Sequence, residues 1–193
     1  PKENSDLAVS GWDASTPSCA TGVQQKTGDS TRTLVGAAYT DAGGAWADTD
    51  GKLWVLSYFN RRSKKSKINI TATLSTSSQT YVEVDPNSRN NFITWSDEIT
   101  NFNTYVPWTN AAATAIYGQN IVDATLSTGS NNGSSSGPNV PGNVQNSTVI
   151  SGVTENTTHY GALYVRASTS VTTFFGGAAS TGEAGAIYII VRG

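Results

Sequence analysis

The stretch Lys67-Ile68-Asn69-Ile70-Thr71-Ala72-Thr73-Leu74 decides the fold class, because apolar residues occupy every second position from Ile68 to Leu74. In an extended strand this spacing places all of them on one face and the polar residues on the other. A helix would instead distribute them around its axis. We therefore predict a half-buried β-strand at 67–74.

Short β-type segments recur on both sides of this stretch, and we expect further strands at 53–59, 80–84, 92–95, 160–165 and 186–191. The first of these is almost continuously apolar, which predicts burial on both faces. The last is expected to be paired inside a sheet. Only 110–117 has helical composition, and it is too short for an independent helix.

Turn signals separate these segments. Asp50-Gly51 predicts a hairpin turn, and Asp85-Pro86-Asn87 predicts another turn. Ser127–Gly142 is rich in Ser, Gly, Asn and Pro, which indicates either a linker between two domains or, as we favour, a flexible loop within one. We expect a single all-β domain at 21–193, an antiparallel β-sandwich of jelly-roll type, preceded by an N-terminal arm or subunit connection at 1–20.

The composition narrows the possible functions. The chain has 193 residues and a mass of 20.2 kDa, and only 13% of its residues are charged. Ser, Thr and Asn make up about a third of the chain, so we expect a surface that is polar through hydroxyl and amide groups. The net charge of −2 gives no general attraction to nucleic acid or anionic membranes. No apolar run approaches the roughly 18 residues of a membrane span.

Metal and disulfide chemistry find little support. Cys19 and His159 are the only residues of their kinds, whereas a disulfide needs two cysteines and structural zinc needs about four Cys or His ligands. Asp48-Thr49-Asp50-Gly51 resembles the opening of a calcium loop, but Phe59 stands where that loop requires a glutamate. We therefore expect neither a metal site nor a cofactor.

A hydrolase would need catalytic groups that the sequence hardly provides. His159 is the only imidazole that could act as a base, and we interpret it as an edge or surface residue at the start of a strand. No G-x-S-x-G motif is present. Asp97 and Glu98 are adjacent, so in a strand they point to opposite faces and do not form the carboxylate pair of a glycosidase. A β-sandwich hydrolase is the third hypothesis, and we expect no catalytic residues.

A basic cluster stands out in this weakly charged chain. It holds five of the 12 Lys and Arg residues, namely Arg61, Arg62, Lys64, Lys65 and Lys67. Such a patch would bind phosphate groups of a cell-surface polysaccharide, nucleic acid or an acidic patch on a partner subunit. Nucleic acid is disfavoured because no aromatic residues interleave with the basic ones. The alternative is a solvated hairpin whose charges protect a sheet edge.

The aromatic residues suggest a second candidate site. The five tryptophans could fill the core, form platforms for sugar rings or anchor a subunit interface. Tyr105-Val106-Pro107-Trp108 has a loop-like composition, so Tyr105 and Trp108 are the best candidates for exposed glycan-binding or interface aromatics. Burial in the core is the alternative for both residues.

The run from Gly22 to Gly36 has the pattern GV-x-x-K-x-G-x-x-x-RTLVG, and Ser57 to Arg62 follows with S-x-x-N-R-R. These motifs, within residues 20 to 100 or roughly 40% of the chain, resemble a segment of bacteriophage tail-fibre and virion surface proteins. The resemblance implies a non-enzymatic virion component, assembled in the host cytoplasm, with a role in attachment or decoration. It further implies a homotrimer that meets other virion proteins, with host-surface glycan as a further candidate partner.

A stand-alone carbohydrate-binding module is the second hypothesis. It predicts that two or three aromatic residues line an exposed sheet face or loop rim, and that the monomer binds sugar without assembly.

Overall fold

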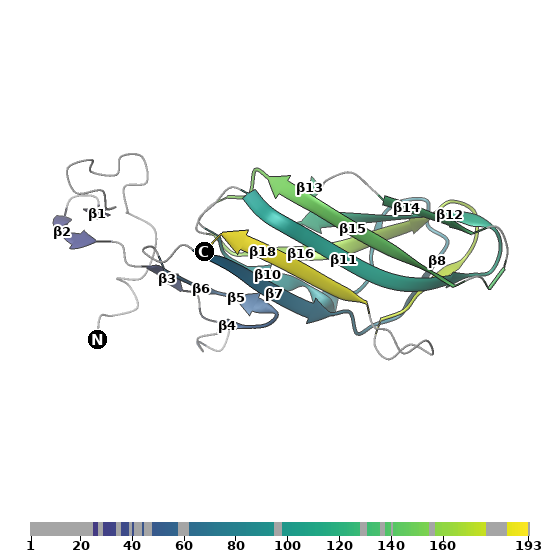
Figure 1. Ribbon diagram of the computed structural model, residues 1–193, viewed down its shortest axis with the longest axis horizontal. Helices are drawn as coiled ribbons and strands as arrows, with labels where there is room; N and C mark the ends of the chain where they lie inside the picture. Colours follow the sequence, from purple (N-terminus) through teal and green to yellow (C-terminus); the bar gives the residue numbers. More distant parts are fainter. Residues whose placement is uncertain are drawn as a thin grey trace.

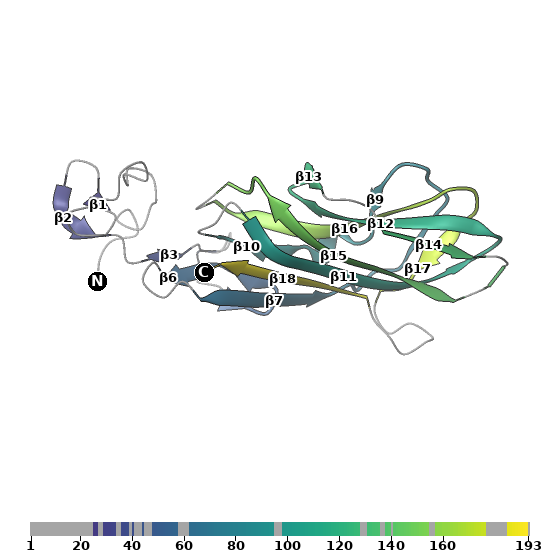
Figure 2. The ribbon, with the colours of Figure 1, turned by 45° about the horizontal axis from the view of Figure 1, so that its top comes forward.

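A computed structural model describes residues 25–26, 29–33, 36–38, 40, 44, 48–57, 62–94, 98–127, 131–135, 138–139, 141–154, 157–176 and 185–192. Nearly all regular structure in these ranges is β-strand, arranged as two sheets that face each other (Figures 1 and 2). The predicted N-terminal arm lies outside the described residues, as do Cys19, Arg61 and Asp97.

The first sheet has six strands in the order β7-β18-β11-β17-β8, and β15 also pairs with β11. Every pairing in this sheet is antiparallel. Its strands are β7 (Ser63–Asn69), β8 (Leu74–Thr76), β11 (Glu98–Asn110), β15 (Gly142–Ser151), β17 (Thr172–Phe174) and β18 (Ala186–Arg192).

The second sheet has eight strands in the order β13-β12-β16-β10-β5-β4, with β14 paired to β12 and β9 paired to β16. The β10–β5 pairing is parallel and the others are antiparallel. Its strands are β4 (Asp48–Thr49), β5 (Lys52–Leu53), β9 (Val82–Glu83), β10 (Asn90–Phe92), β12 (Thr114–Val122), β13 (Leu126–Ser127), β14 (Asn131–Ser135) and β16 (His159–Ala167). Two small pairs join β1 (Gln25–Lys26) to β2 (Asp29–Thr33) and β3 (Gly36–Ala38) to β6 (Val55–Ser57).

The core lies between the two sheets. Phe92 of the eight-stranded sheet and Phe102 and Phe174 of the six-stranded sheet are completely buried. Strands alternate between buried and exposed side chains, as β15 does over its whole length, so each sheet contributes one face to the core. The prediction of an all-β sandwich is therefore confirmed, while its jelly-roll connectivity stays a prediction.

Buried asparagines join the sheets through hydrogen bonds. Asn120 of β12 donates from Nδ2 to the backbone oxygen of Phe102 on β11 (2.7 Å), and its Oδ1 accepts from Thr104 (2.6 Å). Asn146 of β15 donates to the backbone oxygen of Gly118 on β12 (2.8 Å). The amide-rich composition therefore serves the interior as well as the surface. Both ends of the Asn120 amide are hydrogen-bonded, whereas Asn146 Oδ1 is buried without a partner among the described residues.

The strand predicted at 67–74 is interrupted. β7 ends at Asn69, and β8 begins only at Leu74. Between them the backbone N–H groups of Thr71 and Ala72 donate to the carboxylate of Asp85 instead of to a neighbouring strand. The predicted turn beginning at Asp85 is present, because this residue caps the short 3-10 helix η2 (Pro86–Ser88).

Of the other predicted strands and turns, some are confirmed and one is partly wrong. The strands predicted at 160–165 and 186–191 are confirmed as parts of β16 and β18, and β18 lies between β7 and β11. The hairpin at Asp50-Gly51 is confirmed between β4 and β5. Burial on both faces of 53–59 is wrong for β6, where Val55 and Ser57 are exposed and only Leu56 is buried.

The segment 127–142 contains regular structure that its composition did not indicate. Asn131–Ser135 form β14, which pairs with Thr114–Gly118 of β12, so this part is a strand and not a loop. Ladder hydrogen bonds use only backbone groups, so a Ser-, Asn- and Gly-rich segment can add to a sheet edge despite its low strand propensity.

Candidate partner-binding surfaces

The outer side of the six-stranded sheet gathers residues from both candidate sites. Lys67 of β7 lies opposite Tyr188 of β18, which in turn lies opposite Asn103 of β11. Lys65 lies two positions before Lys67 on β7, and Tyr105 lies two positions after Asn103 on β11, so strand alternation keeps both on this same side. We call the surface made by Lys65, Lys67, Asn103, Tyr105 and Tyr188 the lysine face.

Two ammonium groups of the lysine face are held over one aromatic ring. Lys65 Nζ lies 5.2 Å and Lys67 Nζ 5.4 Å from the centroid of the Tyr188 ring. Cation–π contacts at such exposed sites contribute about 0.5–1 kcal/mol each. Among the described residues neither ammonium has a carboxylate within ion-pair distance, so both charges remain available to a partner.

The remaining residues of the basic cluster are separated from this face. Lys64 points to the opposite side of β7, where its Nζ contacts Asp48 Oδ2 at 2.9 Å and the backbone oxygen of Val55 at 2.6 Å. Arg62 is exposed just before β7, and Arg61 lies outside the described residues. Lys64 therefore ties the β4–β5 hairpin to β7.

The two candidate aromatics lie in the middle of β11, so the prediction of a loop at 105–108 is wrong. Tyr105 is half-buried on the lysine face. Trp108 is 3% exposed and belongs to the core, and its ring packs so closely on Gly142 of β15 that no Cβ would fit there.

Pro107 explains why this strand was not recognised. Proline has no N–H for a ladder and is rare in central strands. Here it stands between the last pairing of β18, at Tyr105, and the first pairing of β17, at Trp108. Its carbonyl accepts a hydrogen bond from Phe175 N (2.8 Å), so the missing N–H falls at the junction of two neighbouring strands.

A shallow pocket of about 250 Å³ lies at this junction. Its walls include Tyr105, Pro107, Trp108, Asn143 and Phe175. Aromatic walls with one amide group suit a small ring with polar edges, such as a sugar unit.

The outer side of the eight-stranded sheet carries a second surface, which the sequence analysis missed. Arg166 of β16 stacks on two tyrosines, with its guanidinium carbon 4.2 Å from the centroid of Tyr117 and 5.2 Å from that of Tyr81. Arg89 similarly lies 4.2 Å from the centroid of Tyr160. We call these residues, together with Tyr164, the tyrosine–arginine face.

Glu83 compensates one of the two charges on this face. It accepts two hydrogen bonds from Arg89, at 2.8 and 2.7 Å, and these raise the pKa of Arg89 above its ordinary value. Burial, followed by the charge of Glu83, raises the pKa of Tyr164. Arg166 contacts no carboxylate within the described residues. The sequence does contain one indication of this face: Tyr160, Tyr164 and Arg166 are spaced by even numbers along one strand, which places them on the same side of the sheet.

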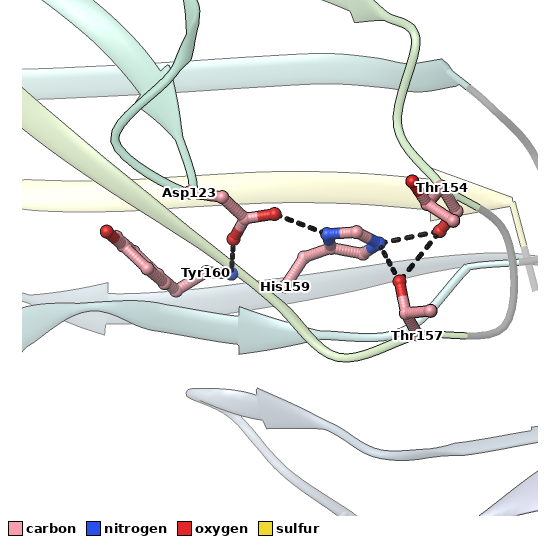
Figure 3. A network of polar contacts seen from close by, with 5 residues as sticks. All are labelled: Asp123, Thr154, Thr157, His159 and Tyr160. Carbon is pink, nitrogen blue, oxygen red and sulfur yellow. Dashed lines mark hydrogen bonds and ion pairs between the residues drawn. The ribbon is translucent and has the colours of Figure 1, made fainter.

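His159 is not the edge or surface residue that we predicted. It begins β16, as expected, but is only 6% exposed, and its ring lies 5.4 Å from that of Phe92. Figure 3 shows its polar contacts: Nδ1 lies 2.6 Å from Asp123 Oδ2, and Nε2 lies 2.8 Å from Thr157 Oγ1.

This Asp–His–Thr arrangement resembles a hydrolytic triad, but a further contact gives it another role. Nε2 also lies 2.6 Å from the carbonyl oxygen of Thr154, which can only accept a hydrogen bond. Nε2 must therefore donate, and it offers no lone pair to the Thr157 hydroxyl. Asp123 also accepts from Tyr160 N (2.9 Å), so the cluster connects the β12–β13 turn to the start of β16.

Comparisons with known proteins give no family: no protein-family model and no curated protein matches the chain. Within the described ranges no three His, Cys, Asp or Glu residues gather as metal ligands. The described part of the chain also has no helix that is long and apolar enough to cross a membrane.

Proposed function

We propose that this chain is a non-enzymatic structural protein of a bacteriophage virion, a tail fibre, tip or head decoration that acts in host attachment or particle assembly. The resemblance of its 20–100 region to virion surface proteins motivates the proposal. The observation that carries it is the lysine face, where two tyrosines, an asparagine and two ammonium groups with no carboxylate partner among the described residues share the outer side of a sheet. A charged sheet surface suits an extended partner better than a small substrate.

Variants of the lysine face test this assignment. The double variant Lys65→Ser/Lys67→Ser should weaken binding to phage particles stripped of the chain, or to host cells, and should reduce the salt dependence of the remaining binding. Lys52→Ser is a matched control, because Lys52 is a lysine stacked on Trp54 in the other sheet. Equal binding by all three proteins would overturn the role of the lysine face.

Localisation in the virion has its own test. Antibodies against the chain should label intact particles from the phage that encodes it, and light scattering of the purified chain should reveal assembly in multiples of three copies of 20.2 kDa. The tyrosine–arginine face supports assembly, because Tyr and Arg are among the residues most enriched at the energetic centres of protein interfaces. Unlabelled particles would contradict the proposal.

A carbohydrate-binding module is the second candidate, and the pocket beside Tyr105 is the observation that favours it. In that case the monomer should bind neutral glycans on an array, Tyr105→Ala should abolish the binding, and Lys65→Ser/Lys67→Ser should leave it unchanged. Binding confined to acidic glycans and lost with the lysines would favour the virion attachment role instead.

A further inference from the structure

The tyrosine–arginine face holds two arginines in similar aromatic settings. The guanidinium carbon of Arg89 lies 4.2 Å from the centroid of the Tyr160 ring, and that of Arg166 lies 4.2 Å from the centroid of the Tyr117 ring. The two arginines differ in what compensates their charge.

Arg89 shows how a carboxylate completes such a setting. Its Nε and Nη2 donate to the two carboxylate oxygens of Glu83, at 2.8 and 2.7 Å, so two planar charged groups meet as a bidentate pair. The face therefore contains one complete unit of tyrosine, arginine and carboxylate.

Arg166 has the aromatic rings without the carboxylate. Tyr117 of β12 and Tyr81, next to β9, lie on opposite sides of it, at 4.2 and 5.2 Å, because β12 and β9 pair with the two edges of β16. Its Nε is buried without a partner, and its Nη1 lies 3.5 Å from the backbone oxygen of Gln79, the outer limit of a hydrogen bond. Among the described residues no carboxylate lies within ion-pair distance of it.

The remaining donors of Arg166 suit a planar anion. Arg166 is half-buried on the outer side of the sheet, and with Nε buried a partner reaches it through the edge that Nη1 and Nη2 form. That edge binds a carboxylate through two parallel hydrogen bonds. Because the two tyrosines already hold the guanidinium, binding costs little further side-chain entropy.

The extent and composition of the face favour a protein partner. From Tyr160 to Arg166 it runs about 20 Å along β16, and from β12 across β16 to β9 it is about 10 Å wide. Such a patch fits the centre of a contact that covers about 800 Å² on each partner. Tyrosine and arginine at such a centre typically carry much of the binding energy. Since Glu83 compensates Arg89, the charge left for a partner is that of Arg166.

We propose that the tyrosine–arginine face binds an acidic segment of another virion protein, and that an Asp or Glu carboxylate of this partner pairs with Arg166 as Glu83 pairs with Arg89. This partner rests on the proposed function, since it belongs to the same virion. The contact is separate from the lysine face, which lies on the outer side of the other sheet.

Binding of the chain to phage particles stripped of it tests the pairing. Arg166→Gln removes the charge and should weaken binding about tenfold or more, with a smaller salt dependence. Arg166→Lys should restore only part of the affinity, because an ammonium lacks the planar fork. Lys52→Gln is the matched control, because Lys52 also stacks on an aromatic ring, that of Trp54.

The outcomes separate this inference from the proposed function. Equal binding by the unsubstituted chain and Arg166→Gln would overturn the pairing and leave the virion role standing. A folded, unsubstituted chain that does not bind the particles would overturn the virion role, and the partner with it. Direct binding of galacturonate oligomers that is lost in Arg166→Gln would assign the face to an acidic glycan instead of a protein.

Cross-linking then locates the partner's carboxylate. On particles carrying Arg166→Lys, a water-soluble carbodiimide activates a carboxylate of the partner, and the introduced amine displaces the activating group as a urea and forms an amide bond. Mass spectrometry should find position 166 joined to an Asp or Glu of another virion protein. Cross-links confined to Lys65 and Lys67 would overturn the proposal.

Discussion

Asp85 accepts two hydrogen bonds from Thr71, one from its backbone N–H and one from its hydroxyl, each 2.9 Å long. The same carboxylate accepts from Ala72 N (2.9 Å), Asn87 N (3.0 Å) and Ser88 Oγ (2.5 Å). The buried Asp85 side chain therefore accepts hydrogen bonds from the backbone N–H groups that lie between the end of β7 and the start of β8.

We expect Asp85→Asn to lower the free energy of unfolding by about 2–4 kcal/mol at pH 7, because an amide nitrogen cannot accept from these donors. Urea unfolding of both proteins measures the loss. Asp50→Asn, at an exposed carboxylate, should change the stability by less than about 0.5 kcal/mol.

The same contacts predict a pH dependence. Burial by itself raises the pKa of Asp85, but the hydrogen bonds from Ser88, Ala72 and Thr71 outweigh it and hold the pKa below its ordinary value of 3.8. The unfolded chain therefore takes up this proton first, and the stabilisation is complete above about pH 4 and decreases as the pH falls further. The stability difference between the unsubstituted protein and Asp85→Asn should narrow from pH 5 to pH 2. A constant difference over that range would contradict the assignment.

The β12–β13 turn contains an avoidable strain. Asp123 and Ala124 have φ angles of 52° and 60°, and Thr125 N donates to the carbonyl of Val122 (3.1 Å), as in a type I′ hairpin turn. Alanine in this left-handed region costs about 1 kcal/mol, which glycine avoids. Ala124→Gly should therefore raise the free energy of unfolding by about 0.5–1 kcal/mol in thermal or urea unfolding.

Ala113 provides the control for this change. It is exposed, as Ala124 is, but has no positive φ. Ala113→Gly should leave the stability unchanged or lower it by about 0.5 kcal/mol, because only the unfolded chain gains freedom. An equal effect of the two substitutions would show that the turn is not strained.

The hydrogen bonds of His159 at the start of β16 predict a loss of stability when the ring is replaced. A second substitution, at Asp123, should restore part of that stability. His159→Phe keeps the packing against Phe92 but removes both ring nitrogens, so the carboxylate of Asp123 loses its ring partner. We expect a loss of about 1–2 kcal/mol, reduced because 34% of the Asp123 side chain is exposed and remains hydrated. Adding Asp123→Asn should recover part of it in a double-mutant cycle, and strictly additive losses would contradict the contact.

The sequence predicts the fold class better than the surfaces, for a physical reason. β16 and β18 are dense in β-branched and aromatic residues, so their strands follow from local preference. The division of the basic cluster depends on strand alternation: with β7 beginning at Ser63, Lys64 necessarily points away from Lys65 and Lys67. The sequence analysis treats the cluster as one patch, with a solvated hairpin as the alternative, and neither interpretation applies strand alternation to it.

The composition does not show which polar residues are buried. Asn120 and His159 have residue types that usually lie at the surface, and their burial depends on partners such as Phe102 and Asp123 that are distant in sequence. The tyrosine–arginine face likewise forms only when β9, β12 and β16 lie side by side. Such pairings have no local signal in a single sequence.

Gly118 of β12 and Val144 of β15 provide the sharpest test of the packing between the two sheets. A Cβ at Gly118 would overlap Val144 Cγ1, and Val144 is 2% exposed and cannot turn its branched side chain into free space. Gly118→Ala should therefore cost about 1–3 kcal/mol through overpacking, and Val144→Ala should cost about 2 kcal/mol through the cavity it leaves. In the double variant the new methyl group occupies part of that cavity, so the combined loss should fall below the sum by about 1 kcal/mol or more. Urea unfolding of the four proteins measures this coupling. Losses that add without coupling would show that these two strands do not pack face to face at this point.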